Sequence, residues 1–211
     1  MIAPRMLVAC EFSGIVRRAF AARGFDAWSC DLLPAEDRSN RHIVGNARDY
    51  LGDGWDLLIV CHPPCTRLCN SGVRWLHQPP PGRSCDAMWQ ELEAAADLFS
   101  AFWTAPIPRI AIENPVMHRH AKERIRDYQP FAQSIQPWQF GHPESKRTCL
   151  WLKELPPLTP TEIVAGRAQR VHCMPPGPDR SRERSRFFPG VAEAMARQWG
   201  DHVLAALAGA A

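Results

Sequence analysis

Apolar residues form short uninterrupted runs along this chain, separated by stretches in which they recur every three or four positions. Uninterrupted runs are typical of strands buried in a parallel sheet, and the longer spacing is typical of helices packed on it. The pattern predicts strands over residues 6–10, 26–30, 42–44, 56–60 and 109–112. It also predicts helices over residues 15–23, 84–103 and 190–208, the first of them closed by Gly24.

This alternation of strands and helices predicts a Rossmann-like α/β fold with a mostly parallel sheet. Two later apolar runs, over 135–138 and 148–152, flank a turn and predict an antiparallel hairpin late in the chain. Two segments rich in proline, glycine and arginine, over 67–84 and 156–189, predict long loops. Long loops often close over binding sites, so the first is a candidate lid.

The length of 211 residues suits one α/β domain over residues 1–211. No apolar run approaches the roughly 20 residues that cross a bilayer, and the first residues lack the layout of a secretion signal. The eight cysteines do not sit in a short secreted scaffold, so we expect free thiols and a cytoplasmic protein without a membrane partner. The net charge of +3 says little about partners.

The strongest candidate for chemistry is the segment Cys61-His62-Pro63-Pro64-Cys65, which directly follows the apolar run 56–60. Neither proline can donate a backbone hydrogen bond, so the strand stops there in a stiff turn. The carboxyl ends of parallel strands are where ligands usually bind. This placement favours Cys65 as a nucleophile over a buried structural cysteine, provided that its thiolate is accessible.

Polar residues follow the other predicted strands as well. Glu113 ends one strand and is suited to act as an acid or a hydrogen-bond acceptor. Asp31 ends another, at a position that often binds a ribose hydroxyl. The turn after the first strand offers close backbone approach and a helix N-terminus, and consists of Glu11, Phe12, Ser13 and Gly14. Together these residues indicate an adenosine-containing cofactor.

In their order along nearly the whole chain, these motifs resemble those of the cytosine-C5 DNA methyltransferases, most closely the short members encoded by phages and prophages. Val8 to Gly14 is similar to the family's cofactor motif, although Val16 replaces its second glycine. Pro63-Pro64-Cys65 resembles the nucleophile motif, with Thr66 in place of glutamine. Further partial matches are Gly45-Asn46, Glu113-Asn114-Pro115, the segment around Arg147, and Gln198 to Val203.

The resemblance implies an S-adenosylmethionine-dependent methyltransferase fold and methylation of cytosine C5 through a covalent cysteine adduct. In that scheme Cys65 adds to C6 of the base, Glu113 binds the N3/N4 edge, and Arg147 helps to hold the base. The residues implied for the cofactor, S-adenosylmethionine, are Glu11, Phe12, Ser13, Gly14, Asp31, Asn46 and Pro63.

DNA is the implied substrate, and its target base has to leave the stack to reach the site. Residues 153–189 correspond to a reduced recognition segment rich in arginine and proline. Arginines can contact phosphates, although a solvated loop explains such a run about as well. Besides His77, the candidate DNA contacts are Arg67, Arg74, Arg180, Arg182, Arg184 and Arg186.

Three other readings compete with a DNA methyltransferase. Cys61, Cys65 and Cys69 recur every four residues, which misses the usual zinc and iron–sulfur spacings, so no metal is predicted. A catalytically inactive methyltransferase fold that only binds DNA remains open, as does an enzyme that modifies free cytidine nucleotides at C5. The last of these needs little basic surface.

Overall fold

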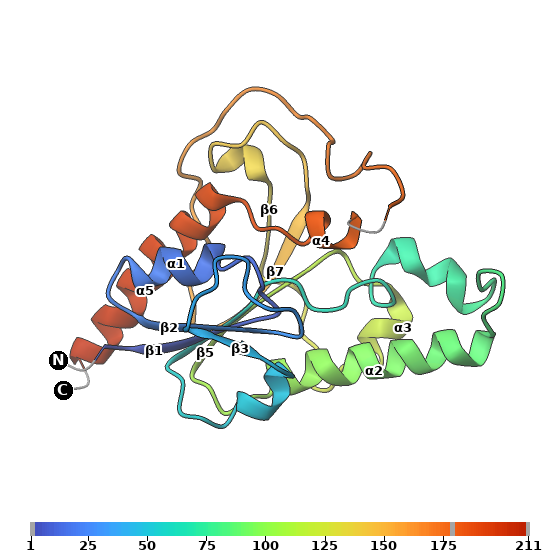
Figure 1. Ribbon diagram of the computed structural model, residues 1–211, viewed down its shortest axis with the longest axis horizontal. Coiled ribbons are helices and arrows are strands. Elements are labelled where there is room, and N and C mark those ends of the chain that lie inside the picture. The colour runs from blue at the N-terminus through green and yellow to red at the C-terminus, as the bar shows by residue number, and fades with distance from the viewer. Residues whose placement is uncertain (1–2, 178–179, 210–211) are drawn as a thin grey trace.

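A seven-stranded sheet forms the centre of the molecule in the computed structural model, which describes residues 3–177 and 180–209 (Figure 1). The strand order is β3-β2-β1-β4-β5-β7-β6. Strands β1 to β5 pair in parallel, whereas β7 is antiparallel to both β5 and β6. The strands are β1 (Arg5–Ala9), β2 (Asp26–Asp31), β3 (His42–Val44), β4 (Leu57–Val60), β5 (Arg109–Asn114), β6 (Gln133–Ile135) and β7 (Thr148–Lys153).

The prediction of a Rossmann-like, mostly parallel sheet with a late antiparallel hairpin is therefore confirmed. Strands β2 and β3 lie on one side of β1, and β4 and β5 lie on the other side. Ligands of such folds usually bind where the strand order switches, which here is between β1 and β4. The predicted strand 135–138 is wrong beyond Ile135. Pro137 has no N–H to give to a ladder, and it begins the 3₁₀ helix η3 (Pro137–Gln139) instead.

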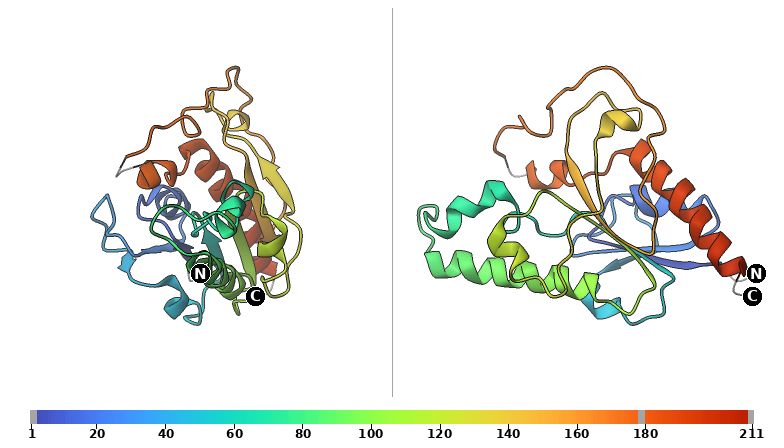
Figure 2. Two further views of the ribbon diagram at one scale, coloured as in Figure 1. Left: turned by 90° about the vertical axis from the view of Figure 1, so that its right-hand side faces the viewer. Right: turned by 180° about the vertical axis from the view of Figure 1, so that it is seen from behind.

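Helices cover both faces of the sheet (Figures 1 and 2). α1 (Ile15–Ala21) and α5 (Pro189–Gly209) pack on one face with Val8 and Ile59, and α2 (Cys85–Trp103) packs on the other with Leu7 and Leu58. Alternate residues of a strand point to opposite faces, so each central strand contributes to two cores. Within the described residues, no helix is long and apolar enough to cross a membrane.

Four short helices lie where the sequence predicted only loops or nothing. They are η1 (Ala47–Tyr50), η2 (Asn70–Leu76), α3 (Arg119–Lys122) and α4 (Arg180–Arg184). The predicted loop over 67–84 therefore contains η2, and the predicted loop over 156–189 contains α4. Residues 178–179 of that second segment lie outside the described residues. Helices of four to seven residues are too short to show the periodicity on which the prediction depended.

The segment around η2 is packed firmly against the rest of the molecule. Leu68 and Leu76 are buried, and the carbonyl oxygen of Thr66 lies where a Cβ on Gly72 would have to be, only 1.7 Å from it. Arg67 ties the segment to α2 through Glu91, with 2.7 Å between Nε and Oε2. Packing and the Arg67–Glu91 pair thus hold the stretch that precedes and includes η2 in place. The predicted role of residues 67–84 as a lid stays a prediction.

Candidate active site

Loops that follow β1, β2, β4 and β5 meet at the carboxyl edge of the sheet, on either side of the point where the strand order reverses. The sequence placed a candidate residue in each of them. The structure confirms that these strands are neighbours, and the four loops therefore share one edge.

The loop after β1 is held by a buried carboxylate. Glu11 accepts hydrogen bonds from the backbone N–H groups of Val16 (2.6 Å) and Arg17 (3.2 Å) at the start of α1. Burial raises the pKa of Glu11 to about 7, against the lowering effect of those two donors. Glu11 therefore fills the helix N-terminus that the sequence offered to a ligand.

Two residues of this loop adopt left-handed backbone conformations. Cys10 has φ of +57°, which costs a non-glycine residue on the order of 1 kcal/mol. Gly14 has φ of +67°, and a Cβ there would lie 2.6 Å from Nη2 of Arg17. The loop is thus bent tightly, and a larger residue at Gly14 would be strained and would displace Arg17.

Phe12 is covered by other parts of the chain. Its carbonyl oxygen accepts a hydrogen bond from the N–H of Glu36 (3.0 Å), and the Arg182 guanidinium lies 5.3 Å from the centre of its ring. Glu36 in turn binds Arg182 (2.8 Å) and both terminal nitrogens of Arg186 (2.6 and 2.7 Å). We call Glu36, Arg182 and Arg186 the α4 clamp. It joins the loop after β2 to two of the arginines predicted to contact DNA.

The loop after β2 presents a carboxylate beside apolar side chains. Asp31 ends the strand, and its Oδ1 accepts a hydrogen bond from the N–H of Leu33 (2.9 Å). Leu32 is 75% exposed, and Val44, the β3 partner of Asp31, is 61% exposed. A carboxylate for hydroxyl groups and apolar side chains for a flat ring suit a nucleoside. Leu32 and Val44 were not predicted, because exposed apolar residues are ordinary until they are placed beside such a carboxylate.

Asn46 lies near the same edge on an exposed turn. Its Oδ1 accepts a hydrogen bond from the N–H of Arg48 (3.2 Å) and so caps η1. The predicted contact of Asn46 with an adenine stays a prediction. Ser13, also predicted for the cofactor, is buried, and its Oγ accepts a long hydrogen bond from the N–H of Ile15 (3.4 Å).

Cys65 follows β4 in a tight turn. The buried Pro63 and exposed Pro64 lead into it, and its carbonyl oxygen accepts hydrogen bonds from the N–H groups of Leu68 and Cys69, both at 3.0 Å. This geometry places Cys65 and Cys69 on the same side of one helical turn. Cys65 is half-buried, so its sulfur remains within reach of a ligand.

The pKa values of the two thiols in this turn shift in opposite directions. The hydrogen bond to Cys69, burial, and the nearby charge of Glu113 all raise the pKa of Cys65. The hydrogen bond from Cys65, together with the Ser71 hydroxyl (3.1 Å from the sulfur) and backbone N–H groups of Ser71 and Gly72, lowers the pKa of Cys69 to about 5. In the free protein Cys65 is therefore a neutral thiol, so its activation depends on the groups around it.

Glu113 ends β5 beside β4 and is buried. The Nδ1 atom of His62 lies 3.3 Å from Oε2 of Glu113. The next residue, Asn114, is fully buried, and within the described residues neither atom of its side-chain amide has a hydrogen-bond partner. Buried amides are rarely left unsatisfied, so Asn114 has hydrogen-bonding capacity available for a bound molecule or water.

Two adjacent residues before β7 point in different directions. Arg147, the predicted base-holding residue, is exposed, and its guanidinium lies 6.0 Å from the ring of Phe131. Lys146 lies on the other side: its Nζ donates a hydrogen bond to the carbonyl oxygen of Arg184 (3.3 Å), and its charge lowers the pKa of both His62 and Cys65. Lys146 was not predicted, although neighbours in extended chain face opposite sides.

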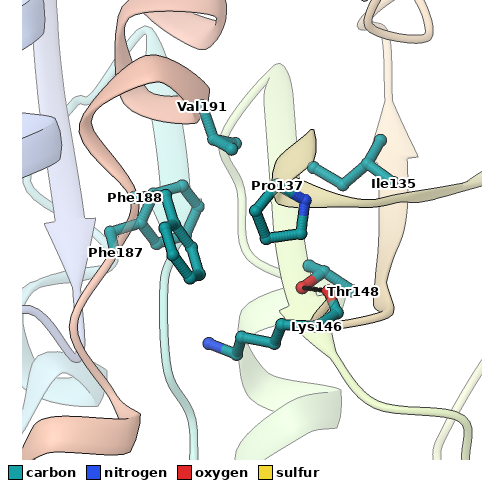
Figure 3. Close-up of a pocket in the computed structure, with 7 residues that line it drawn as sticks. All are labelled: Ile135, Pro137, Lys146, Thr148, Phe187, Phe188 and Val191. Atoms are coloured by element: carbon teal, nitrogen blue, oxygen red, sulfur yellow. Dashed lines mark hydrogen bonds between the residues drawn. The ribbon is translucent and has the colours of Figure 1, made fainter. Parts of the chain in front are cut away.

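A narrow pocket beside Lys146 separates the β6–β7 hairpin from the start of α5 (Figure 3). The lysine side chain extends across it from the hairpin side towards the two phenylalanines. The cavity volume of about 10 Å³ has room for one water molecule at most. Any ligand larger than a water molecule therefore needs some opening of this region to enter here. The lining residues are Ile135, Pro137, Lys146, Thr148, Phe187, Phe188 and Val191.

The remaining arginines predicted to contact DNA differ in their surroundings. The side chain of Arg67 is only 13% exposed and is paired with Glu91. Arg74 is exposed and stacks on Trp75, with 4.1 Å between the guanidinium and the ring centre. Arg180 donates to the carbonyl oxygen of Met174 (2.9 Å), and the carbonyl of Arg184 accepts from Lys146. Their contacts with DNA stay predictions.

The possible metal ligands among residues 3–177 and 180–209 do not cluster. Nowhere in these ranges do three or more histidine, cysteine, aspartate or glutamate side chains gather in an arrangement that could hold a metal ion. The eight cysteines of the chain are all free thiols.

The sheet order and its edge define a Rossmann-like α/β protein with a thiol, a carboxylate and an imidazole beside the switch point of the sheet. No family model and no curated protein matches the chain. Among solved structures, it is similar to a chain from E. coli provisionally described as a DNA modification methyltransferase encoded within a prophage. The two share 15% sequence identity with a TM-score of 0.47. The match covers 82% of this chain and 56% of that chain, so this chain spans little more than half the length of its match.

Proposed function

We propose that this protein methylates cytosine at C5 in DNA, using S-adenosylmethionine and a covalent adduct at Cys65. The observation that carries the proposal is the placement of Cys65 and Glu113 at the ends of adjacent parallel strands, close enough for the carboxylate to act on the thiol. A pyrimidine ring between them has its C6 and its N3/N4 edge within reach of the two groups that attack and hold it.

The residues present suit S-adenosylmethionine. Asp31 offers a carboxylate for the ribose hydroxyls, and Leu32 and Val44 offer apolar surface for the adenine. The loop from Glu11 to Gly14 borders the methionine end, with Phe12 beneath the α4 clamp. The cofactor supplies an electrophilic methyl group carried on a sulfonium.

The chain's own residues supply the rest of the chemistry. The Cys65 thiol gives up its proton to a water molecule and its sulfur then forms a bond to C6; the positive charge of Lys146 favours the thiolate that this requires. Glu113 meets the N3/N4 edge, and a proton held between its oxygen and N3 neutralises the negative charge that develops there as the sulfur adds to C6. Once C5 carries the methyl group, C5 gives up its proton to a water molecule. The electron pair of that C–H bond re-forms the C5–C6 double bond, and Cys65 leaves C6 as a thiolate.

Incubation with isotope-labelled S-adenosylmethionine and either duplex DNA or dCMP tests the proposal, with nucleosides analysed by mass spectrometry. We expect labelled 5-methylcytosine in DNA, none with Cys65→Ser, and a loss of about 100-fold with Glu113→Gln. Cys173→Ser removes an exposed thiol and serves as the matched control.

Other outcomes would favour the competing functions. Label on dCMP but not on DNA would indicate a nucleotide-modifying enzyme, which the engagement of Arg182 and Arg186 by Glu36 makes worth testing. DNA binding with a steep salt dependence, but without cofactor binding or label, would indicate a DNA-binding protein that lacks the activity.

A further inference from the structure

The imidazole of His62 is enclosed between the end of β4 and two other parts of the chain. Its Nδ1 lies 3.3 Å from Oε2 of Glu113, and its ring centre lies 5.4 Å from that of Phe187. Only 11% of the side chain is exposed, and Nε2 is buried with no hydrogen-bond partner among the described residues. His62 precedes Pro63, which restricts its backbone, so the ring is fixed from several sides.

The surroundings determine which nitrogen of His62 carries its proton. Burial, followed by the positive charge of Lys146, lowers the pKa of His62, so the ring is neutral near pH 7. A neutral imidazole has one N–H, and a carboxylate only accepts hydrogen bonds. The proton therefore belongs on Nδ1, where it is donated to Oε2 of Glu113, and Nε2 keeps its lone pair.

We propose that His62 is a positioning residue for Glu113: its Nδ1–H holds Oε2, which leaves Oε1 to meet the pyrimidine. This role rests on the proposed function, because it assigns the second carboxylate oxygen to the target base. A carboxylate on a flexible side chain would otherwise rotate, and small errors in the placement of a catalytic group reduce rates strongly. Phe187 closes the far side of the ring and keeps the imidazole in this orientation.

Replacing His62 by asparagine or glutamine distinguishes a role in positioning Glu113 from a role in packing alone. The amide nitrogen of asparagine can take the place of Nδ1, whereas that of glutamine reaches the place of Nε2. In single-turnover methyl transfer we expect His62→Asn to lose at most about five-fold, and His62→Gln and His62→Leu to lose about 100-fold. Affinities for S-adenosylmethionine and DNA stay within about two-fold of wild type, because Glu113 stabilises charge that develops only during the reaction. His172→Gln, at an exposed histidine, is the control.

A second measurement determines the tautomer of His62 beside Glu113 and requires no methyl transfer. Nitrogen-15 NMR of the imidazole at pH 7 should show Nδ1 protonated and Nε2 unprotonated in the wild-type protein. The opposite tautomer overturns the proposal, and so does an equal loss of rate in His62→Asn and His62→Leu. If the wild-type protein binds cofactor and shows the expected tautomer but transfers no methyl group to any substrate, the proposed function fails for a reason separate from the His62–Glu113 contact, and the positioning role falls with it.

Discussion

At the scale of single residues, the neighbouring thiols of Cys65 and Cys69 affect the pKa of each other in opposite directions. The hydrogen bond from Cys65, a hydroxyl and backbone N–H groups lower the pKa of Cys69 at the start of η2, while the pKa of Cys65 is raised, which favours its protonated form. The cost is low reactivity of Cys65 in the free protein. In the proposed reaction, a base bound beside Glu113 and Lys146 changes those surroundings.

Cys69→Ser should make Cys65 easier to ionise. Serine carries no charge near pH 7, so the repulsion between the two sulfurs disappears and the pKa of Cys65 moves down, although burial and Glu113 still hold it above that of an ordinary thiol. Alkylation of Cys65 by iodoacetamide, followed by peptide mass spectrometry from pH 6 to 10, measures this. The exposed Cys173 is an internal reference. An unchanged pH profile would show that Cys69 does not control Cys65.

Glu11 makes the stability of the protein depend on pH. Its pKa is about 7 in the folded protein and about 4.5 when unfolded, so the folded state binds the proton more tightly. The contribution of protonated Glu11 to the free energy of unfolding is therefore fully present below pH 4.5 and is lost as the pH rises through 7. The difference of about 2.5 in pKa corresponds to about 3 kcal/mol.

We accordingly expect Glu11→Gln, which carries no charge, to gain stability relative to wild type as the pH rises. The difference in Tm between variant and wild type should increase by about 5–10 °C between pH 5 and pH 8. Calorimetry at the two values measures it, and Glu193→Gln on the exposed side of α5 is the control. A difference that is the same at both values contradicts the assignment.

At the scale of secondary-structure elements, the sequence predicted the long pieces well. β1, β4, α2 and α5 lie within one or two residues of their predicted bounds, because long apolar runs and periodic stretches are visible in any surroundings. Ser84 caps α2 as its type suggests, with Oγ accepting from the N–H of Ala87 (3.1 Å). The short helices η2, α3 and α4 were missed because contacts with the rest of the chain, rather than their own sequence, fix them.

η2 depends on one glycine. A Cβ on residue 72 would collide with the carbonyl oxygen of Thr66, which belongs to the backbone and has no rotamer to change. We expect Gly72→Ala to lower the free energy of unfolding by about 2–4 kcal/mol, measured by urea denaturation. Gly52→Ala, at a position with nothing within 4 Å of the new Cβ, is the matched control. A loss no larger than that of the control would show that the turn adjusts freely.

α4 is held to the sheet edge mainly by charge. The clamp of Glu36 with Arg182 and Arg186 spans about 150 residues of sequence and covers Phe12. Partly exposed pairs of this kind contribute about 0.2–1 kcal/mol each and weaken in salt. We expect Glu36→Gln to speed tryptic cleavage after Arg182 and Arg186 about five-fold, and added salt to do the same to the wild-type protein. Glu123→Gln, which affects a surface pair on α3, should leave the cleavage rate unchanged.

At the scale of the whole molecule, the parallel sheet gathers distant residues at one edge. Cys65, Glu113 and Asp31 were predicted because strand ends are readable from sequence and parallel topology brings them together. His62 and Lys146 were not, since their roles arise only from contacts: one ring lies against Glu113, and one amine lies on the opposite side from Arg147. Which neighbour a side chain meets depends on tertiary packing, and no pattern within a single sequence gives that directly.

The account as a whole depends on a bond between the sulfur of Cys65 and C6 of a cytosine. A duplex that carries 5-fluorocytosine tests it most directly, because fluorine cannot leave C5 as a proton does, and the adduct is therefore trapped. With S-adenosylmethionine present, we expect a complex that survives denaturation and a peptide containing Cys65 that carries the methylated base. Methyl transfer to ordinary cytosine without a trapped complex, or a complex formed through another residue, would contradict the account.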